Sequence, residues 1–210
     1  MKGLKLIIKL LLIGIYPVFI VFLSARIAYT EPLVRLTYST IRIKEDPLPK
    51  EDRLNLAILG LRAVTTSKGM EEFENAGVFN QKEINHMKDV KNLLTIVFSS
   101  LYFMIFLYLL SAFFLGFKEL KKIMLSGAIF TFILIALTLL FAIISYETLF
   151  VGFHELFFKE DSWRFRDEDM LLRIYPMEFW FKSTVYAGTI GIFLCIISFL
   201  LGYFSKAKTS

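Results

Sequence analysis

Three long uncharged stretches dominate the pattern of hydrophobic and polar positions along this chain. They cover residues 92–116, 123–146 and 183–205. Each is longer than the ~20 apolar residues that a helix needs to cross a bilayer. A fourth stretch, 4–23, is apolar except for Lys5 and Lys9, whose long side chains can reach the headgroups from one end of the segment. The pattern predicts an all-α membrane protein with a single integral membrane domain, residues 1–210, and four transmembrane helices.

A cleaved signal peptide is the alternative for the first of these segments, because it follows a basic start. A typical cleavage site has small residues at two defined positions. The exit of this segment, from Phe22 to Arg26, lacks that pair. A retained transmembrane helix is therefore the favoured prediction.

The segment 24–89, between the first two predicted spans, contains shorter elements. Residues 33–43 are rich in β-branched side chains and alternate apolar with polar from Val34, which is typical of a half-exposed strand. Residues 44–50 contain two prolines and predict a loop. Residues 51–64 have apolar positions at helical spacing, which predicts a short amphipathic helix on the sheet or in the membrane interface.

A helix start follows in the same segment. Asn80 and Glu83 have the spacing of a capping box, so a helix should begin there and run without a break into the second span. This helix places His86 about one turn before Val90, near the membrane surface. Asp89 lies three residues after His86 and so falls on the same helix face.

The segment after the third span, residues 147–182, combines apolar and reactive side chains. Residues 148–158 are strongly apolar yet include His154. In a helix, Phe150 on one side and Phe157 and Phe158 on the other would lie one turn from this histidine, in an aromatic stripe. The stretch is too short for another span, so it lies in the interface or continues the third helix outward.

The composition supports the membrane assignment. Hydrophobic residues make up 56% of the chain and phenylalanine alone numbers 23, while charged residues reach only 20%. A soluble domain of this size cannot bury so much apolar surface, so soluble and disordered classes are excluded. The single cysteine excludes an intrachain disulfide.

The net charge of +5 is unevenly distributed. Eight lysines and one glutamate lie at the two termini and between the second and third spans, which leaves a balance of −2 for the remainder. An excess of basic residues in short loops marks the cytoplasmic side. Both termini are therefore predicted to be cytoplasmic, and the loops 24–89 and 147–182 to face outward. The charge is a topology signal, and no nucleic-acid partner is predicted.

The outer segments contain both histidines of the chain, His86 and His154. A zinc-protease motif is excluded because Phe158 stands where its second histidine would be. With Asp89, two histidines could bind a metal. They could equally serve as general base and general acid, since an imidazole titrates near neutral pH. The residues alone leave both possibilities open.

Two stretches resemble signatures of the lipoprotein intramolecular transacylase (Lit) family. Residues 83–91 are similar to its E-x-x-H-M-x-D-V-K pattern. Residues 153–158 are similar to its F-H-x-x-F-F pattern, and Trp163 and a hydrophobic-Pro-x-x-Phe run at 174–179 follow as in the family. The length and the four-span layout also agree, so the resemblance covers the whole chain.

The resemblance implies an acyltransferase of the bacterial cell membrane. It would move the sn-2 acyl chain of an S-diacylglyceryl-cysteine lipoprotein to the α-amine of the same cysteine, which gives the lyso-form. A diacylated lipoprotein and membrane lipid would be its partners, and no cofactor or metal is expected. A non-catalytic membrane scaffold and a histidine-based metal-binding membrane protein are the alternatives.

The same reading assigns roles to individual residues. His86 and His154 would be the catalytic residues, one as base and the other as acid in an order left open, brought close together in a cavity on the outer face. Further roles are imidazole orientation by Asp89 or Glu155, oxyanion binding by Asn85, Arg164 or backbone amides, and substrate contacts from Phe150, Phe153, Phe157 and Trp163.

Overall fold

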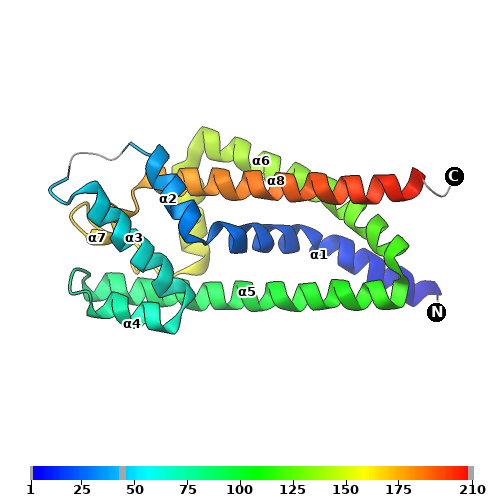
Figure 1. The fold of residues 1–210 in the computed structure, drawn as a ribbon, viewed down its shortest axis with the longest axis horizontal. Coiled ribbons are helices and arrows are strands. Elements are labelled where there is room, and N and C mark those ends of the chain that lie inside the picture. The colour runs from blue at the N-terminus through cyan, green and yellow to red at the C-terminus, as the bar shows by residue number, and fades with distance from the viewer. Residues whose placement is uncertain (1, 43–45, 208–210) are drawn as a thin grey trace. The chain divides into compact units, whose positions relative to one another are not determined.

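The computed structural model describes residues 2–42 and 46–207, and all regular secondary structure among them is helical (Figure 1). No strand occurs among these residues. The helices are α1 (Lys2–Ala28), α2 (Glu31–Thr40), α3 (Lys50–Thr65), α4 (Ser67–Asn75), α5 (Gln81–Leu115), α6 (Phe117–Phe157), α7 (Met170–Ile174) and α8 (Met177–Ala207).

Four of the helices, α1, α5, α6 and α8, are long and apolar enough to cross a membrane. They contain the four predicted spans, so the prediction of a multi-pass helical membrane protein is confirmed. Each helix is longer than its apolar run. The first turns of α5, with Lys82, Lys88 and Lys91, and the end of α6 after Tyr146 lie outside the membrane-spanning runs.

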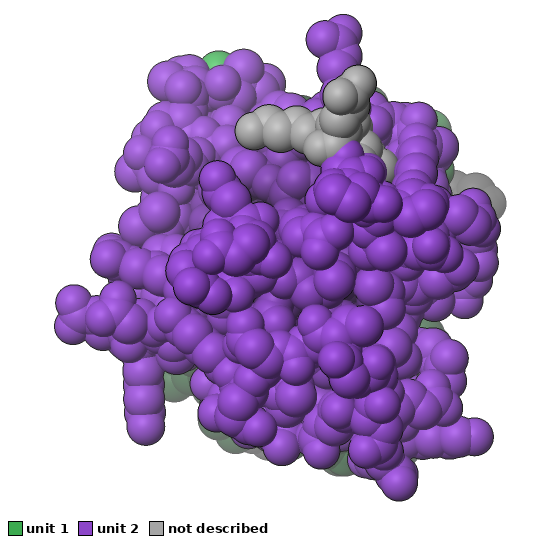
Figure 2. All heavy atoms as spheres, turned by 90° about the vertical axis from the view of Figure 1, so that its left-hand side faces the viewer, with its two compact units in different colours: residues 1–27, 98–140, 186–210 green, residues 28–97, 141–185 purple. Residues whose placement is uncertain are grey.

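The chain divides into two compact units, which Figure 2 colours separately. Unit 1 comprises residues 1–27, 98–140 and 186–210. Unit 2 comprises residues 28–97 and 141–185 and contains both histidines.

The core of unit 1 joins side chains of α1, α5, α6 and α8. Tyr16 is 1% exposed at its centre, and its hydroxyl lies 2.6 Å from the hydroxyl of Ser198 on α8. The hydroxyl of Tyr108 on α5 donates to the carbonyl oxygen of Leu12 on α1, at 2.8 Å. Both hydroxyl groups are satisfied, as buried polar groups in an apolar core must be.

Small residues let α6 approach α1 and α8 closely in unit 1. A Cβ atom added at Gly127 of α6 would lie 2.4 Å from Cγ of Tyr16. Gly188 and Gly191 of α8 similarly leave room for the side chains of Leu139 and Ile135 on α6. Such close contacts replace the hydrophobic effect as the source of helix association in lipid.

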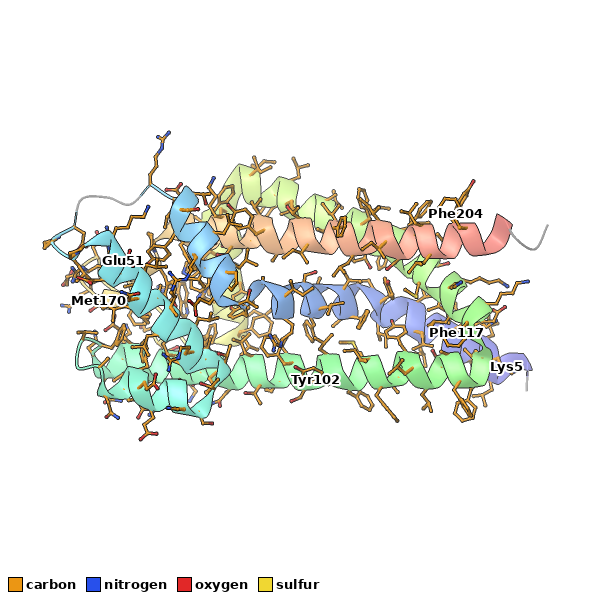
Figure 3. All side chains as sticks on the ribbon, viewed as in Figure 1. Lys5, Glu51, Tyr102, Phe117, Met170 and Phe204 are labelled. Atoms are coloured by element: carbon orange, nitrogen blue, oxygen red, sulfur yellow. The ribbon has the colours of Figure 1, made fainter. Side chains whose placement is uncertain are left out.

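Large apolar side chains cover the outer surface of unit 1. The labelled residues Tyr102, Phe117 and Phe204 in Figure 3 are each more than half exposed. An exposed apolar surface of this kind is costly in water and is satisfied by contact with lipid. The burial pattern of unit 1 therefore agrees with the membrane assignment.

The predicted strand over 33–43 is wrong, because these residues belong to α2 as far as Thr40. The hydroxyl of Thr37 donates to the carbonyl oxygen of Leu33, at 2.8 Å, across one helical turn. Val34, Thr37 and Tyr38 are buried at helical spacing. The burial of this face outweighs the strand preference of β-branched residues, which is a weak and context-dependent term.

The neighbouring predictions are largely met. The amphipathic helix predicted over 51–64 is confirmed by α3, which packs against α2, α4 and α7. Residues 46–49 are non-helical, as expected of the loop, while residues 43–45 lie outside the described residues. Asp46 accepts two hydrogen bonds from Arg173, at 2.9 and 2.6 Å. This guanidinium lowers the pKa of Asp46 to about 2.

The close approach at Gly127 generates a stability prediction. Gly127→Ala should destabilise the protein by about 1–3 kcal/mol, because the added methyl group overlaps the ring of Tyr16. Gly14→Ala is the matched control, since nothing lies within 4 Å of a Cβ atom at Gly14. Thermal unfolding in detergent, followed by intrinsic fluorescence, should show a lower melting temperature for Gly127→Ala only. Equal melting temperatures would contradict the close packing.

Candidate functional site

The first histidine is positioned by the start of α5. Asn80 accepts a hydrogen bond from the backbone N–H of Glu83, at 3.0 Å. Glu83 accepts one from the backbone N–H of Asn80, at 2.7 Å. This reciprocal pair is the predicted capping box, which is confirmed. One turn further along α5, His86 is buried, with 8% exposure.

A second set of bonds ties a distant part of the chain to this helix start. The other carboxylate oxygen of Glu83 accepts from the backbone N–H of Leu171, at 2.6 Å. The side-chain amide of Asn80 donates to Asp169, at 2.9 Å, and Asp169 accepts from the backbone N–H of Arg166, at 2.7 Å. Glu83 is 1% exposed, so these bonds are shielded from water. They hold residues 166–171 against the first turns of α5.

The second histidine lies on the last turns of α6. The helix continues outward past the apolar run, as one of the two predicted alternatives proposed, and is interrupted at Ser145 by a non-helical backbone conformation (φ −152°, ψ 72°). His154 is half-buried near its end. Its Nδ1 atom lies 2.8 Å from the carbonyl oxygen of Phe150, one turn earlier.

The two imidazole rings face each other within unit 2. Their centroids are 6.0 Å apart, and the ring planes differ by 25°. His86 comes from α5 and His154 from α6, so no local pattern could bring them together. The predicted proximity of the two histidines is therefore found in the structure.

Aromatic side chains enclose this histidine pair. Phe158 and Phe165 lie edge-on to His86, with centroid distances of 5.0 and 5.4 Å. Phe150 and Trp163 lie closest to His154, with centroid distances of 4.0 and 4.8 Å. The rings of Phe153 and Phe158 also contact His154, at 5.5 and 5.4 Å.

The aromatic wall differs in part from the sequence prediction. Phe150, Phe153 and Trp163 lie against His154 as predicted. Phe157 instead packs on Phe153, at 4.9 Å, and is exposed. Phe158 belongs to the aromatic stripe predicted from helical spacing, and its ring contacts both histidines. The residue that sequence reasoning missed is Phe165, which carried no local signal.

The predicted supporting residues are more exposed than the histidines. Asp89 and Asn85 are exposed on α5, and the side-chain oxygen of Asn85 accepts from Gln81, at 2.9 Å. Among the described residues, Nδ1 of His86 is buried without a hydrogen-bond partner, so Asp89 does not bond this atom. Glu155 forms an ion pair with Arg164, at 3.4 Å, and this guanidinium lies over the ring of Trp163.

Burial controls the charge of both rings, which lie outside the membrane-spanning runs. It lowers the pKa of His86 to about 4, with smaller electrostatic contributions from His154 and Lys82. Burial also lowers the pKa of His154, against the opposing effect of its bond to Phe150. Both imidazoles are consequently neutral at pH 7.

The contact with Phe150 also fixes the tautomer of neutral His154. A carbonyl oxygen can only accept a hydrogen bond, so Nδ1 must carry the ring proton. The lone pair then resides on Nε2, which leaves this atom available to accept a proton. The site thus offers one oriented base and a second neutral imidazole beside it.

The described residues contain no group of three or more His, Cys, Asp or Glu side chains arranged to hold a metal ion. Cys195, the single cysteine, is buried in the core of unit 1 and plays no part in the histidine site of unit 2. Two neutral imidazoles within an apolar enclosure are suited to proton transfer.

Comparisons with known proteins agree on one family. The family model described as lipoprotein intramolecular transacylase Lit matches residues 10–180. An uncharacterized protein of Aquifex aeolicus is 38% identical over 204 residues, which cover 93% of this chain and 90% of that protein. The membrane-integral lipoprotein intramolecular transacylase Lit of Bacillus cereus has a similar fold, with a TM-score of 0.74 and 21% identity over 99% of this chain and 98% of that one. A form of the same protein with a histidine-to-alanine mutation gives a TM-score of 0.66 at 23% identity, over 99% and 96% of the two chains.

The two hydrogen bonds that Glu83 accepts, from the backbone N–H groups of Asn80 and Leu171, form a clamp between α5 and residues 166–171. This clamp generates a prediction about the pKa of His86. Glu83→Gln replaces one of the two acceptor oxygens by an NH2 group, which cannot accept from a backbone N–H. Loss of that buried hydrogen bond costs about 1–3 kcal/mol. Residues 166–171 should loosen and admit water to His86. Because water favours the charged ring, the pKa of His86 should rise from about 4 toward the ordinary value of 6.5. Titration of the ring by NMR in detergent measures this change.

Asp46→Asn is the matched control for this experiment. It weakens another polar contact of unit 2, the pair with Arg173, at a carboxylate that has no part in the clamp. The pKa of His86 should stay low in this variant even if the protein loses similar stability. An unchanged His86 titration in folded Glu83→Gln protein would show that the clamp does not enclose the ring.

Proposed function

The chain belongs to the lipoprotein intramolecular transacylase family, and we propose that it carries out this reaction with His86 and His154 on the outer face of the membrane. The enzyme is an integral membrane acyltransferase. Its proposed substrate is a bacterial lipoprotein whose N-terminal cysteine bears an S-diacylglyceryl group and a free α-amine. The single observation that carries the assignment of the site is the enclosed pair of neutral imidazoles, 6.0 Å apart.

The proposed reaction moves one acyl group within a single substrate molecule. The α-amine nitrogen forms a bond to the carbonyl carbon of the sn-2 ester, and the bond from that carbon to the glycerol oxygen breaks. The proton lost by nitrogen ends on the glycerol oxygen. The product is an N-acyl, S-monoacylglyceryl cysteine, and no water or cofactor is consumed.

His154 acts as the base in this scheme. An α-amino group titrates near pH ~8, so the ammonium form first releases one proton to the solvent, and the free amine must then lose a second proton as it attacks the ester. Nε2 of His154 is the free lone pair that can take this proton, because Nδ1 is held by the Phe150 carbonyl. The resulting imidazolium then returns the proton to the departing glycerol oxygen.

His86 supports the same step from the other side. A neutral imidazole carries one N–H group, which can donate to the ester oxygen as that oxygen becomes negative. The low pKa of His86 keeps its ring neutral beside the cation that forms on His154. This separates the roles of the two rings, which sequence reasoning leaves open.

The intramolecular reaction explains why two histidines suffice. The substrate supplies its own nucleophile, so no serine or cysteine nucleophile is needed. Correct orientation of two reacting groups in one molecule lowers the barrier by roughly 7–11 kcal/mol. The aromatic wall around the histidines excludes water, which would otherwise hydrolyse the ester.

Substitution of the histidines tests the proposed chemistry. His86→Ala and His154→Ala should each reduce formation of the lyso-form about 10²–10⁴-fold, the usual contribution of general acid-base catalysis. Mass spectrometry of a lipoprotein N-terminal peptide from cells with each variant measures the product. Glu168→Gln, on an exposed residue of the same loop, is the control and should be fully active. An undiminished yield from the double histidine variant would refute the proposal.

The proposed orientation rests on the lysines of unit 1. Lys9, near the start of α1, forms an ion pair with Glu119, which also pairs with Lys122 of α6. The start of α1 and the start of α6 therefore lie at the same end of unit 1. This arrangement supports a cytoplasmic location for the lysine-rich end and both termini.

Cysteine labelling in whole cells tests this orientation. In a Cys195→Ser background, Pro47→Cys should react with a membrane-impermeant thiol reagent in intact cells, because it is proposed to lie outside. Lys118→Cys, between the second and third spans, should react only after the cells are opened. The reverse pattern would place the histidine site on the cytoplasmic side and exclude the proposed substrate location.

A further inference from the structure

A surface cavity of about 280 Å³ lies beside the histidine pair in unit 2. Its lining residues are Glu155, Phe158, Glu160, Trp163 and Arg164. A water molecule occupies ~30 Å³ in the liquid, so the cavity holds about nine waters or a residue or two of an extended peptide.

The cavity shares two walls with the histidine site. The ring of Trp163 lies 4.8 Å from the ring of His154. The ring of Phe158 contacts both His86 and His154, at 5.0 and 5.4 Å. The cavity and the histidine site therefore meet at the rings of Trp163 and Phe158.

The charges of the cavity do not balance. Arg164 is neutralised by its ion pair with Glu155. Glu160 is exposed and forms no ion pair with any described residue, which leaves one excess negative charge on the lining. The flanking residues Lys159 and Asp161 carry opposite charges and do not line the cavity.

We propose that this cavity binds the polypeptide segment that directly follows the acylated cysteine, and that Glu160 makes it favour a basic over an acidic residue there. The inference rests on the proposed function, because it assumes a lipoprotein substrate at the histidine pair. The acyl chains and the polypeptide leave the same cysteine in different directions. Phe150 and Phe153 offer an apolar surface on one side of His154, whereas the cavity offers charged groups.

The lining suits a peptide backbone as well as a charged side chain. The guanidinium of Arg164 can donate to a peptide carbonyl, and the carboxylates of Glu155 and Glu160 can accept from peptide N–H groups. The excess negative charge attracts a lysine or arginine side chain and repels an aspartate or glutamate. Exposed charges interact weakly, so the preference should be about twofold to fivefold and should fall with added salt.

Three synthetic diacylated lipopeptides test this inference. They are identical except for Lys, Gln or Glu directly after the acylated cysteine, and kcat/KM for lyso-form production is measured for each by mass spectrometry in detergent. The unaltered enzyme should rank them Lys, Gln, Glu. Glu160→Gln should reduce the differences, and Glu160→Lys should reverse the order, because the net charge of the lining becomes positive.

Asp167→Lys provides the matched control. Asp167 is an exposed acid in the same loop that does not line the cavity, so this variant makes the same charge change elsewhere. It should keep the original order if Glu160 acts by contact within the cavity. A reversal in Asp167→Lys, or an unchanged order in Glu160→Lys, would overturn the inference.

The lipopeptide assay distinguishes failure of the cavity assignment from failure of the proposed transacylase function. Conversion of all three lipopeptides at equal rates by the unaltered enzyme overturns the cavity assignment and leaves the transacylase function intact. No conversion of any lipopeptide by folded enzyme overturns the function itself, and the cavity assignment with it.

Discussion

The carboxylate of Glu83 is the contact on which the histidine site most depends. It accepts from two backbone N–H groups, one at its own helix start and one at Leu171, and it is almost completely buried. A buried carboxylate without partners would be very costly, so its bonds strongly constrain where residues near Leu171 can lie. That constraint brings Phe165 and the rest of the aromatic wall to His86.

The enclosure has a direct chemical consequence, because it decides the protonation of the two histidine rings. An exposed histidine is partly cationic near neutral pH, and the protonated fraction cannot accept the proton that an attacking amine loses. Burial among aromatic side chains keeps both rings neutral, with the pKa of His86 near 4. In the proposed reaction, the same wall excludes water that would compete with the amine for the ester. A single packing feature therefore keeps the two rings neutral and limits the access of water.

The sequence predicts those parts of the molecule that follow from local patterns. The four spans follow from uninterrupted apolar runs, and the start of α5 follows from the spacing of Asn80 and Glu83. The prediction of a strand over 33–43 was wrong because a short alternation of apolar and polar residues can also fit a helix. The same residues form one buried face of that helix. The bond from Glu83 to Leu171 and the approach of Phe165 to His86 join residues far apart in the chain. They depend on tertiary packing, which no local pattern encodes.

The residues that form the wall around the histidines are not all held in place equally firmly. Leu171 is held by the buried carboxylate of Glu83, whereas Arg164 is held by a bond from Lys82 to its carbonyl oxygen and by its ion pair with Glu155, which are both exposed. Exposed ion pairs contribute little to stability, while a buried polar group loses its full hydrogen-bonding energy when a partner leaves. Opening of the wall therefore costs least near Arg164, beside the charged cavity, and most near Leu171. The clamp at Glu83 therefore keeps His86 in place even when the wall opens beside the charged cavity.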